Sequence, residues 1–130
     1  MYLYSRIVLT IAGACILLGG LYDLFTPRLP ANLANRCSDN EGAAMVMREL
    51  LRALGACLVA IGAALGIVIT SMDLRHDYHA IALILTLVLP SEGLNVFCMR
   101  RAGSPYMIPA LFILLTLAGA VLALLAPDGR

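Results

Sequence analysis

The chain contains few charged residues and no lysine. Only 13% of its 130 residues are charged, against about 25% in soluble domains, while 62% are hydrophobic, against about 45–50%. With a mean hydropathy of +0.93, the chain has too little polar surface to cover a water-exposed globule. The net charge of +1, with arginine as the only basic residue type, provides no basic field for nucleic acid, whose binding depends on neutralising phosphates. We therefore exclude a soluble domain and expect no nucleic-acid partner.

Motifs for catalysis and metal binding are also absent from the sequence. The four cysteines lack the paired spacing of a zinc site or a redox motif. No Ser/His/Asp arrangement, phosphate-binding glycine loop or zinc signature is present. His76 and His79 lie three residues apart, and a solvated loop explains them better than a shared metal ion. We therefore predict no metal site and no catalytic residue, and the sequence favours a protein that is not an enzyme.

Long apolar segments account for most of the chain. A hydrocarbon core about 30 Å thick is crossed by roughly 20 apolar helical residues. Four segments approach or exceed this length and together contain one charged residue, Glu92; they are residues 7–22, 53–72, 80–99 and 102–127. We therefore predict an all-α integral membrane protein, a four-helix transmembrane bundle with a single domain over residues 1–130. The expected spans are about 4–24, 45–72, 79–99 and 106–126.

The aromatic residues support the four-span count independently of hydropathy. All five tyrosines fall at the boundaries of the expected spans, as an interfacial aromatic belt requires; they are Tyr2, Tyr4, Tyr22, Tyr78 and Tyr106. The first span also has the shape of a signal peptide, because Arg6 precedes an apolar run. The run continues past the faint cleavage-like site at Cys15, so we expect a retained helix.

Turn and capping residues predict where the helices begin and end. The first helix should end before Pro27, since the residue preceding a proline avoids the helical region. Ser38, followed three residues later by Glu41, reads as a capping box at the start of the second long helix. From there to Met72 the helix would be roughly 50 Å long, so its first turns should lie in or above the headgroups.

Antiparallel threading brings the polar residues of all four spans to one end of the bundle. Glu92 lies eight residues before Arg100, about 12 Å along the helix axis, and therefore well inside the apolar slab. An isolated charge at that depth is costly, so an ion pair is expected. We predict a pair between Arg52 and Glu92, with Arg48, Glu49 and Asp23 as alternative partners.

Helical spacing predicts which way these groups point. One stripe of the second long helix combines charged and small residues: Arg48, Arg52, Gly55, Val59, Gly62 and Gly66. Within it, Gly62 and Gly66 form a GxxxG pair that would let another backbone approach closely. The first helix has a similar stripe of Gly13, Ile16, Gly20 and Asp23. The charges continue these packing faces, so we expect them to point into protein rather than lipid.

Two interpretations of this polar cluster are compatible. In the first, the charges satisfy one another and determine the register of the bundle. In the second, they line a pocket for an anionic head group, a quinone or a small solute, as intramembrane ionisable groups often do. The candidate ligand-binding residues are Arg48, Arg52, Glu92 and Asn95, with Asp23, Glu49 and Tyr106 at the rim. Arginine would hold the anionic or carbonyl group, and Glu92 would adjust the charge of the pocket or take a proton.

Parts of the first 70 residues resemble the DoxX-like group of small bacterial four-span membrane proteins. The resemblance is carried by residues 20–27 (GLYDLFTP), by residues 49–56 (ELLRALGA) and by Ile61-Gly62. It implies a location in a bacterial inner membrane and an accessory role beside a larger redox or thiol-handling complex, with Glu49, Arg52 and Gly55 as the carried-over positions. A quinone or a lipid is the ligand that it implies, and no other cofactor is expected.

These observations lead to three functional hypotheses. The first is a non-enzymatic accessory or ligand-binding protein whose partners are membrane lipid and a larger complex or a second copy of itself. The second is a small oligomeric transporter or channel in which Glu92 is the coupling carboxylate. The third, a membrane enzyme with Glu92 as general base, lacks an accompanying nucleophile or metal set. Loop 1 connects the first two spans and loop 3 connects the last two. Six arginines lie near these loops and three lie on the other side, which predicts that loops 1 and 3 are cytoplasmic and both termini outside.

Overall fold

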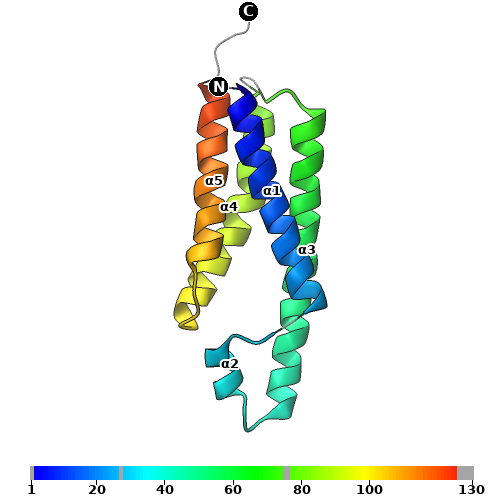
Figure 1. Cartoon of the computed structure of the whole chain (residues 1–130), viewed down its shortest axis with the longest axis vertical. Helices are drawn as coiled ribbons and strands as arrows, with labels where there is room; N and C mark the ends of the chain where they lie inside the picture. Colours follow the sequence, from blue (N-terminus) through cyan, green and yellow to red (C-terminus); the bar gives the residue numbers. More distant parts are fainter. Residues whose placement is uncertain (1, 27, 75–76, 126–130) are drawn as a thin grey trace, which may run out of the picture.

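The described part of the chain is helical throughout, without a strand. The computed structural model describes residues 2–26, 28–74 and 77–125. Its helices are α1 (Tyr2–Phe25), α2 (Ala31–Arg36), α3 (Glu41–Ser71), α4 (Tyr78–Arg101) and α5 (Met107–Leu124) (Figure 1). The four long helices are each long and apolar enough to cross a membrane. The prediction of an all-α, four-helix transmembrane bundle is therefore confirmed, and the chain is a small multi-pass membrane protein.

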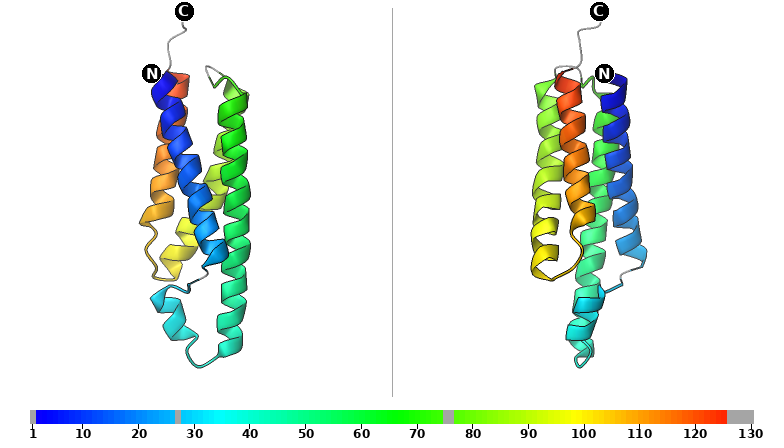
Figure 2. Two further views of the ribbon diagram at one scale, coloured as in Figure 1. Left: turned by 45° about the vertical axis from the view of Figure 1, so that its right-hand side comes forward. Right: turned by 60° about the vertical axis from the view of Figure 1, so that its left-hand side comes forward.

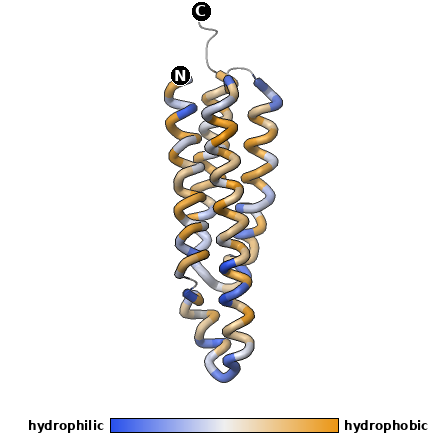
Figure 3. The backbone as a smooth tube through the Cα atoms, turned by 90° about the vertical axis from the view of Figure 1, so that its right-hand side faces the viewer, coloured by the Kyte–Doolittle hydropathy of each residue, from blue (hydrophilic) through white to orange (hydrophobic). Residues whose placement is uncertain are grey.

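The four long helices alternate in direction, so that α1 begins and α5 ends at the same end of the bundle (Figure 1). The connection from α1 to α3, which contains α2, and the turn from α4 to α5 lie together at the opposite end. Helix α3 has 31 residues, about 46 Å at 1.5 Å per residue, and exceeds the thickness of a hydrocarbon core. Its first turns, with α2 beside them, extend beyond the α4–α5 turn (Figure 2). This extension carries much of the hydrophilic sequence, as expected for a headgroup location (Figure 3).

The start of α3 differs from the predicted capping box. Asn40 is the N-cap, and its side-chain oxygen accepts a hydrogen bond of 3.0 Å from the backbone N–H of Ala43. Ser38 instead donates its hydroxyl to the carbonyl of Asn35 at 3.0 Å. The prediction was wrong because Ser38 lies in the turn that follows α2, where its hydroxyl satisfies a carbonyl near the end of that short helix.

Glycines bring α1 and α3 into backbone contact. A Cβ atom added to Gly55 would lie 2.6 Å from the backbone nitrogen of Leu24 and 2.7 Å from the carbonyl oxygen of Gly20. A Cβ atom on Gly62 would lie 2.8 Å from the Cα of Leu17. The small-residue stripes of α1 and α3 therefore face each other, and the two close-contact glycines of α3, Gly55 and Gly62, lie seven residues apart. The predicted GxxxG pair is wrong in its second member, because Gly66 has no neighbouring atom within 4 Å of its Cβ position.

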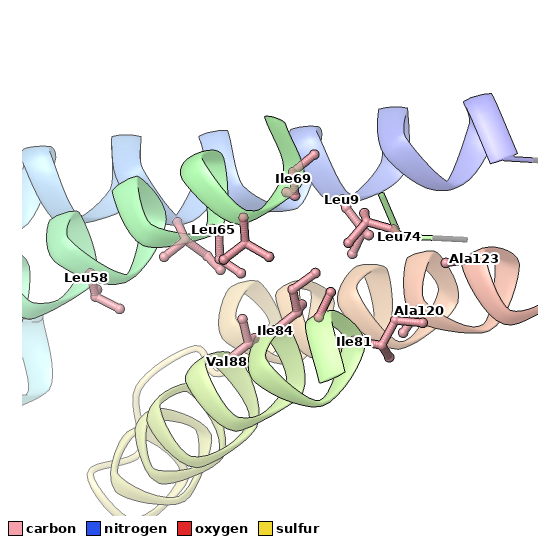
Figure 4. Packing of buried hydrophobic residues seen from close by; sticks show 13 residues of the cluster. Leu9, Leu58, Leu65, Ile69, Leu74, Ile81, Ile84, Val88, Ala120 and Ala123 are labelled. Carbon is pink, nitrogen blue, oxygen red and sulfur yellow. The ribbon is translucent and has the colours of Figure 1, made fainter. Parts of the chain in front are cut away.

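The apolar core lies between the four long helices, toward the end where α1 begins (Figure 4). It contains Leu9 and Ile16 from α1, Leu65 from α3 and Ile84 and Val88 from α4. At this end the buried Ser5 and the partly buried Arg6 both have hydrogen-bond partners. The hydroxyl of Ser5 donates to the carbonyl of Gly119 at 2.8 Å, and the guanidinium of Arg6 donates to the carbonyl of Ile69 at 2.9 Å.

The contacts around the bundle are unequal. Helix α1 packs extensively on α3 and on α5, and α4 packs on α5, whereas α3 and α4 touch much less. The α1–α3 pair and the α4–α5 hairpin therefore separate toward the end where α2 lies (Figure 1). This separation creates the space in which the polar residues of the spans are found.

Candidate functional site

Glu92 is the most deeply buried charged residue of the described chain, with 1% of its surface exposed. It continues the buried face of α4 that also contains Ile81, Ile84 and Val88, at helical spacing. Neither oxygen of its carboxylate has a hydrogen-bond partner among the described residues. A buried polar group without a partner costs about 1–3 kcal/mol, and more when it is charged. The position of Glu92 therefore requires an explanation beyond packing.

The side chain of Glu92 borders a cavity of about 280 Å³ in the half of the bundle nearer to α2. All four long helices contribute to its walls, together with Pro105 from the α4–α5 turn. Four of the lining residues carry polar side chains: Tyr22, Asp23, Glu92 and Asn95. The rest of the wall is apolar, and includes Leu58 and Phe112. We call this space the Glu92 cavity.

The polar groups of the cavity come from two helices. Asp23 lies in the last turn of α1 and is half-buried, one residue after the exposed Tyr22. Asn95 lies three residues after Glu92 on the same helix, which places its amide close to the carboxylate. Two carboxyl groups, an amide and a phenol thus surround the space. No arginine is among the described residues that line it.

The predicted ion pair between Arg52 and Glu92 is wrong. Arg52 instead forms a 2.7 Å salt bridge with Glu49, three residues earlier on α3, and both side chains are about half exposed. The α3 residue beside Glu92 in the cavity wall is Leu58, six residues or roughly 9 Å further along the helix than Arg52. The two charges therefore lie at different depths, and the loose contact between α3 and α4 does not bring them together.

Arg48 is exposed as well, at the edge of a separate surface hollow that also contains Arg28. The predicted stripe on α3 thus divides: Gly55 and Gly62 face α1, whereas Arg48 and Arg52 precede the part of α3 that α1 covers. Their long side chains can reach the headgroup zone from there. The expectation that these charges point into protein is therefore wrong for both arginines.

Of the seven predicted site residues, the structure brings three together at one cavity: Asp23, Glu92 and Asn95. Arg48, Glu49 and Arg52 lie outside it on the exposed part of α3. Tyr106 precedes α5 and is exposed rather than part of the cavity wall. Whether any of the seven residues binds a ligand stays a prediction.

Sequence reasoning missed Ser104, a second buried polar residue at this end. Only 7% of its surface is exposed, and its hydroxyl has no hydrogen-bond partner among the described residues. The preceding Gly103 has a φ of 69° and ends α4 in a Schellman motif. In this motif the backbone N–H of Ser104 donates to the carbonyl of Met99 at 2.9 Å, which brings the residue back onto the helix. In the sequence, Gly103, two residues after Arg101, was the signal for this turn.

Comparison with known proteins finds no matching family model, no similar curated protein and no similar solved structure. The resemblance to the DoxX-like group therefore stays a prediction. Within the described residues, no three His, Cys, Asp or Glu side chains come together as a metal site would require, and His76 lies outside those residues. The chemistry available in the Glu92 cavity is that of carboxyl, amide and phenolic hydroxyl groups in apolar surroundings.

Proposed function

We propose that the protein binds, in the Glu92 cavity, a membrane-soluble small molecule that carries a positive charge or hydrogen-bond donors at one end. The observation that supports this most directly is the buried carboxylate of Glu92, which borders the cavity without a partner. A ligand that donates to this carboxylate would remove the cost of leaving it unsatisfied. The protein acts in this proposal as a binding or accessory protein rather than as an enzyme.

The composition of the cavity wall determines the sign of the ligand. Asp23 and Glu92 are both carboxylic, and no arginine or lysine lies beside them among the described lining residues. An anionic head group would therefore meet like charge without a compensating cation, which is unfavourable in an apolar environment. The expectation from the sequence, an anion held by arginine, is replaced by a cationic or donor ligand held by carboxylate and amide oxygens.

A reporter at the cavity tests this proposal. The chain contains no tryptophan, so Tyr22→Trp introduces a single tryptophan, which can be excited selectively, beside the cavity at an exposed position. In lipid nanodiscs, butylamine is expected to change its fluorescence saturably, while butanol and butyrate bind more weakly. Because hydrogen bonds to charged groups contribute about 1.5–3 kcal/mol, Glu92→Gln should weaken butylamine binding tenfold or more.

Glu49→Gln is the matched control, since it changes an exposed glutamate outside the cavity in the same way. It should leave the affinity for butylamine within twofold of the parent. Equal affinities for the Glu92→Gln and parent proteins, or a preference for butyrate, would contradict the proposal. Mass spectrometry of small molecules that copurify with the protein then identifies the natural ligand class.

The second candidate function is transport, in which Glu92 is the coupling carboxylate. It is favoured by the position of Pro90 and Gly93 on either side of Glu92 within α4. Proline removes one backbone hydrogen bond of the helix, and Gly93 has open space at its Cβ position. Such a helix can bend where the carboxylate lies. Transport predicts pH-dependent amine uptake into proteoliposomes that Glu92→Gln abolishes. A binding protein predicts no uptake with either the parent or the Glu92→Gln protein.

The proposal includes a location in a bacterial inner membrane, which the DoxX-like resemblance implies, and an orientation, which arginine placement predicts. The sequence places three of the nine arginines near the other end of the bundle. The remaining six lie near the α2 end: Arg28, Arg36, Arg48, Arg52, Arg100 and Arg101. Because Arg48 and Arg52 are exposed, they count as interfacial charge, which supports placing the α2 end in the cytoplasm. Cys37, at the end of α2, should then react with a membrane-impermeant maleimide only in inverted vesicles.

A further inference from the structure

A second cavity, of about 260 Å³, lies beside the Glu92 cavity. It is formed where α2 approaches α3 and the last turns of α4, and we call it the α2 groove. Its walls are largely apolar and include Leu33, Leu51, Leu54 and Cys98. Its polar lining residues are Asn95 and Ser104. Asn95 and Met99 also line the Glu92 cavity, so the two spaces adjoin at these two side chains.

Each of the adjoining cavities is lined by a buried polar group that has no hydrogen-bond partner among the described residues. In the Glu92 cavity this group is the carboxylate of Glu92, and in the α2 groove it is the hydroxyl of Ser104. Unpartnered buried polar atoms are rare in native structures, and each requires an explanation such as strain, a water, an ion or a ligand. Two of them in neighbouring cavities point to one occupant that reaches both.

The apolar walls of the α2 groove indicate what this occupant is. Cavities lined by Leu and similar residues stay dry and accept apolar molecules, whereas a water needs two to four polar partners. The groove offers few polar partners along its length, so a hydrocarbon chain fits it better than a file of waters. Met99 borders both spaces, and methionine is flexible enough to let a chain pass.

We infer that the Glu92 cavity and the α2 groove together hold one extended amphiphile, with a cationic or donor group at Glu92, an apolar chain in the groove and a second polar group at Ser104. This inference rests on the proposed function and adds the shape and class of the ligand, a long-chain amine with a distant hydroxyl or carbonyl. Because a helical carbonyl points toward the C-terminus, the N–H of Ser104 that donates to Met99 lies about one turn beyond Met99, roughly 15 Å along α4 from Glu92. A chain of about eight carbons, with a hydrogen bond of about 2.8 Å at each end, spans this distance.

A length series of ligands tests the inference with the Tyr22→Trp reporter in nanodiscs. Alkylamines of four, eight and twelve carbons are compared with amino alcohols of the same lengths that carry a hydroxyl at the far end. In lipid an apolar chain gains little by moving from bilayer to protein, so chain length alone should change affinity weakly. The terminal hydroxyl should improve affinity about fivefold at eight carbons, as one buried hydrogen bond does, and not at four or twelve.

Two variants locate the effect. Ser104→Ala should abolish the hydroxyl advantage at eight carbons, whereas Ser91→Ala, whose hydroxyl donates to the carbonyls of Leu87 and Val88, should retain it. Leu51→Phe narrows the groove without adding a tryptophan and should also abolish the advantage, whereas Leu50→Phe, at the neighbouring exposed position, should not.

The outcomes separate the inference from the proposed function. A hydroxyl advantage that is the same at every length, or that survives both Ser104→Ala and Leu51→Phe, overturns the inference. Butylamine binding that still depends on Glu92 would in that case leave the proposed function standing. If Glu92→Gln leaves the binding of every amine unchanged, the proposed function fails, and the inference fails with it.

Discussion

Helices α1 and α4 are equally long, at 24 residues each, and the sequence assigns them similar roles as membrane spans. Their surroundings differ. Helix α1 packs on both α3 and α5, meets the backbone of α3 at Gly20, and has the hydroxyl of its buried Ser5 hydrogen-bonded. Helix α4 packs mainly on α5, and its buried Glu92 has no hydrogen-bond partner among the described residues.

This difference shows how a small bundle can combine close helix packing on one side with cavities on the other. Close contact between α1 and α3 supplies packing, which is the main driving force for association of helices in lipid. The looser side, between α3 and α4, leaves room for the Glu92 cavity and the α2 groove. Four tests compare the packed side with the open side, from the largest expected effect to the smallest.

The largest effect is expected at the contact between α1 and α3. Gly55→Ala places a methyl group 2.6 Å from the backbone of Leu24, and backbone cannot move aside as a flexible side chain can. The helices must separate, at a cost of about 3 kcal/mol. Gly66→Ala adds the same methyl group to the same helix, in open space, and should change stability by less than about 1 kcal/mol. Reversible unfolding in mixed micelles measures both, and equal effects would contradict the assigned contact.

On the open side, removing the unpartnered carboxylate is expected to stabilise the ligand-free protein. Glu92→Met keeps a side chain of similar length and removes a buried polar group, which should raise the free energy of unfolding by about 1–3 kcal/mol. Glu49→Met, at an exposed position, should change it by less than about 1 kcal/mol. A large loss of stability in the Glu92→Met protein would mean that Glu92 has a structural partner.

Two buried serines make a matched pair across the two sides. Ser5→Ala removes a hydroxyl that donates to the carbonyl of Gly119, and should cost about 1 kcal/mol. Ser104→Ala removes a hydroxyl without a partner among the described residues, and should be neutral or slightly stabilising in the absence of ligand. The same unfolding measurement compares them, and a reversed order would show that the polar groups are satisfied differently.

The smallest effect is expected at the exposed ion pair. Arg52→Ala breaks a half-exposed salt bridge with Glu49, which contributes about 0.2–1 kcal/mol. Combined with Glu92→Met, its effect should be additive within about 0.5 kcal/mol, because the two residues share no partner. Strong coupling between the two substitutions would instead support the Arg52–Glu92 ion pair that the sequence predicted.

Much of the fold was predictable because its signals are local. The number of spans follows from charge-free segments such as 53–72, and the tyrosines at the span boundaries independently indicate the same number. The packing face of α1 was predictable from the spacing of Gly13, Ile16 and Gly20, all of which are buried. The N-cap of α3 was not predictable, because Ser38 and Asn40 are both good capping residues. Asn40 is the N-cap because the hydroxyl of Ser38 donates to a carbonyl at the end of α2 instead.

The candidate site was predictable in part. The end of the bundle and three cavity residues, Asp23, Glu92 and Asn95, followed from antiparallel threading and helical spacing. The lack of a partner for Glu92 among the described residues did not follow, because the relative depth of α3 and α4 depends on how far α3 extends beyond α1. Ser104 was missed because its burial depends on the turn at Gly103.

The amino-acid sequence alone determined that this chain crosses a membrane four times, and that its ionisable groups meet at one end. It could do so because hydropathy and helical spacing act over one or two turns of a single helix. Only the tertiary structure decided which of these groups share a cavity and which reach the headgroups. That choice depends on close contact at Gly20 and Gly55 and on the separation of α3 from α4, and both are set by packing between helices far apart in the chain.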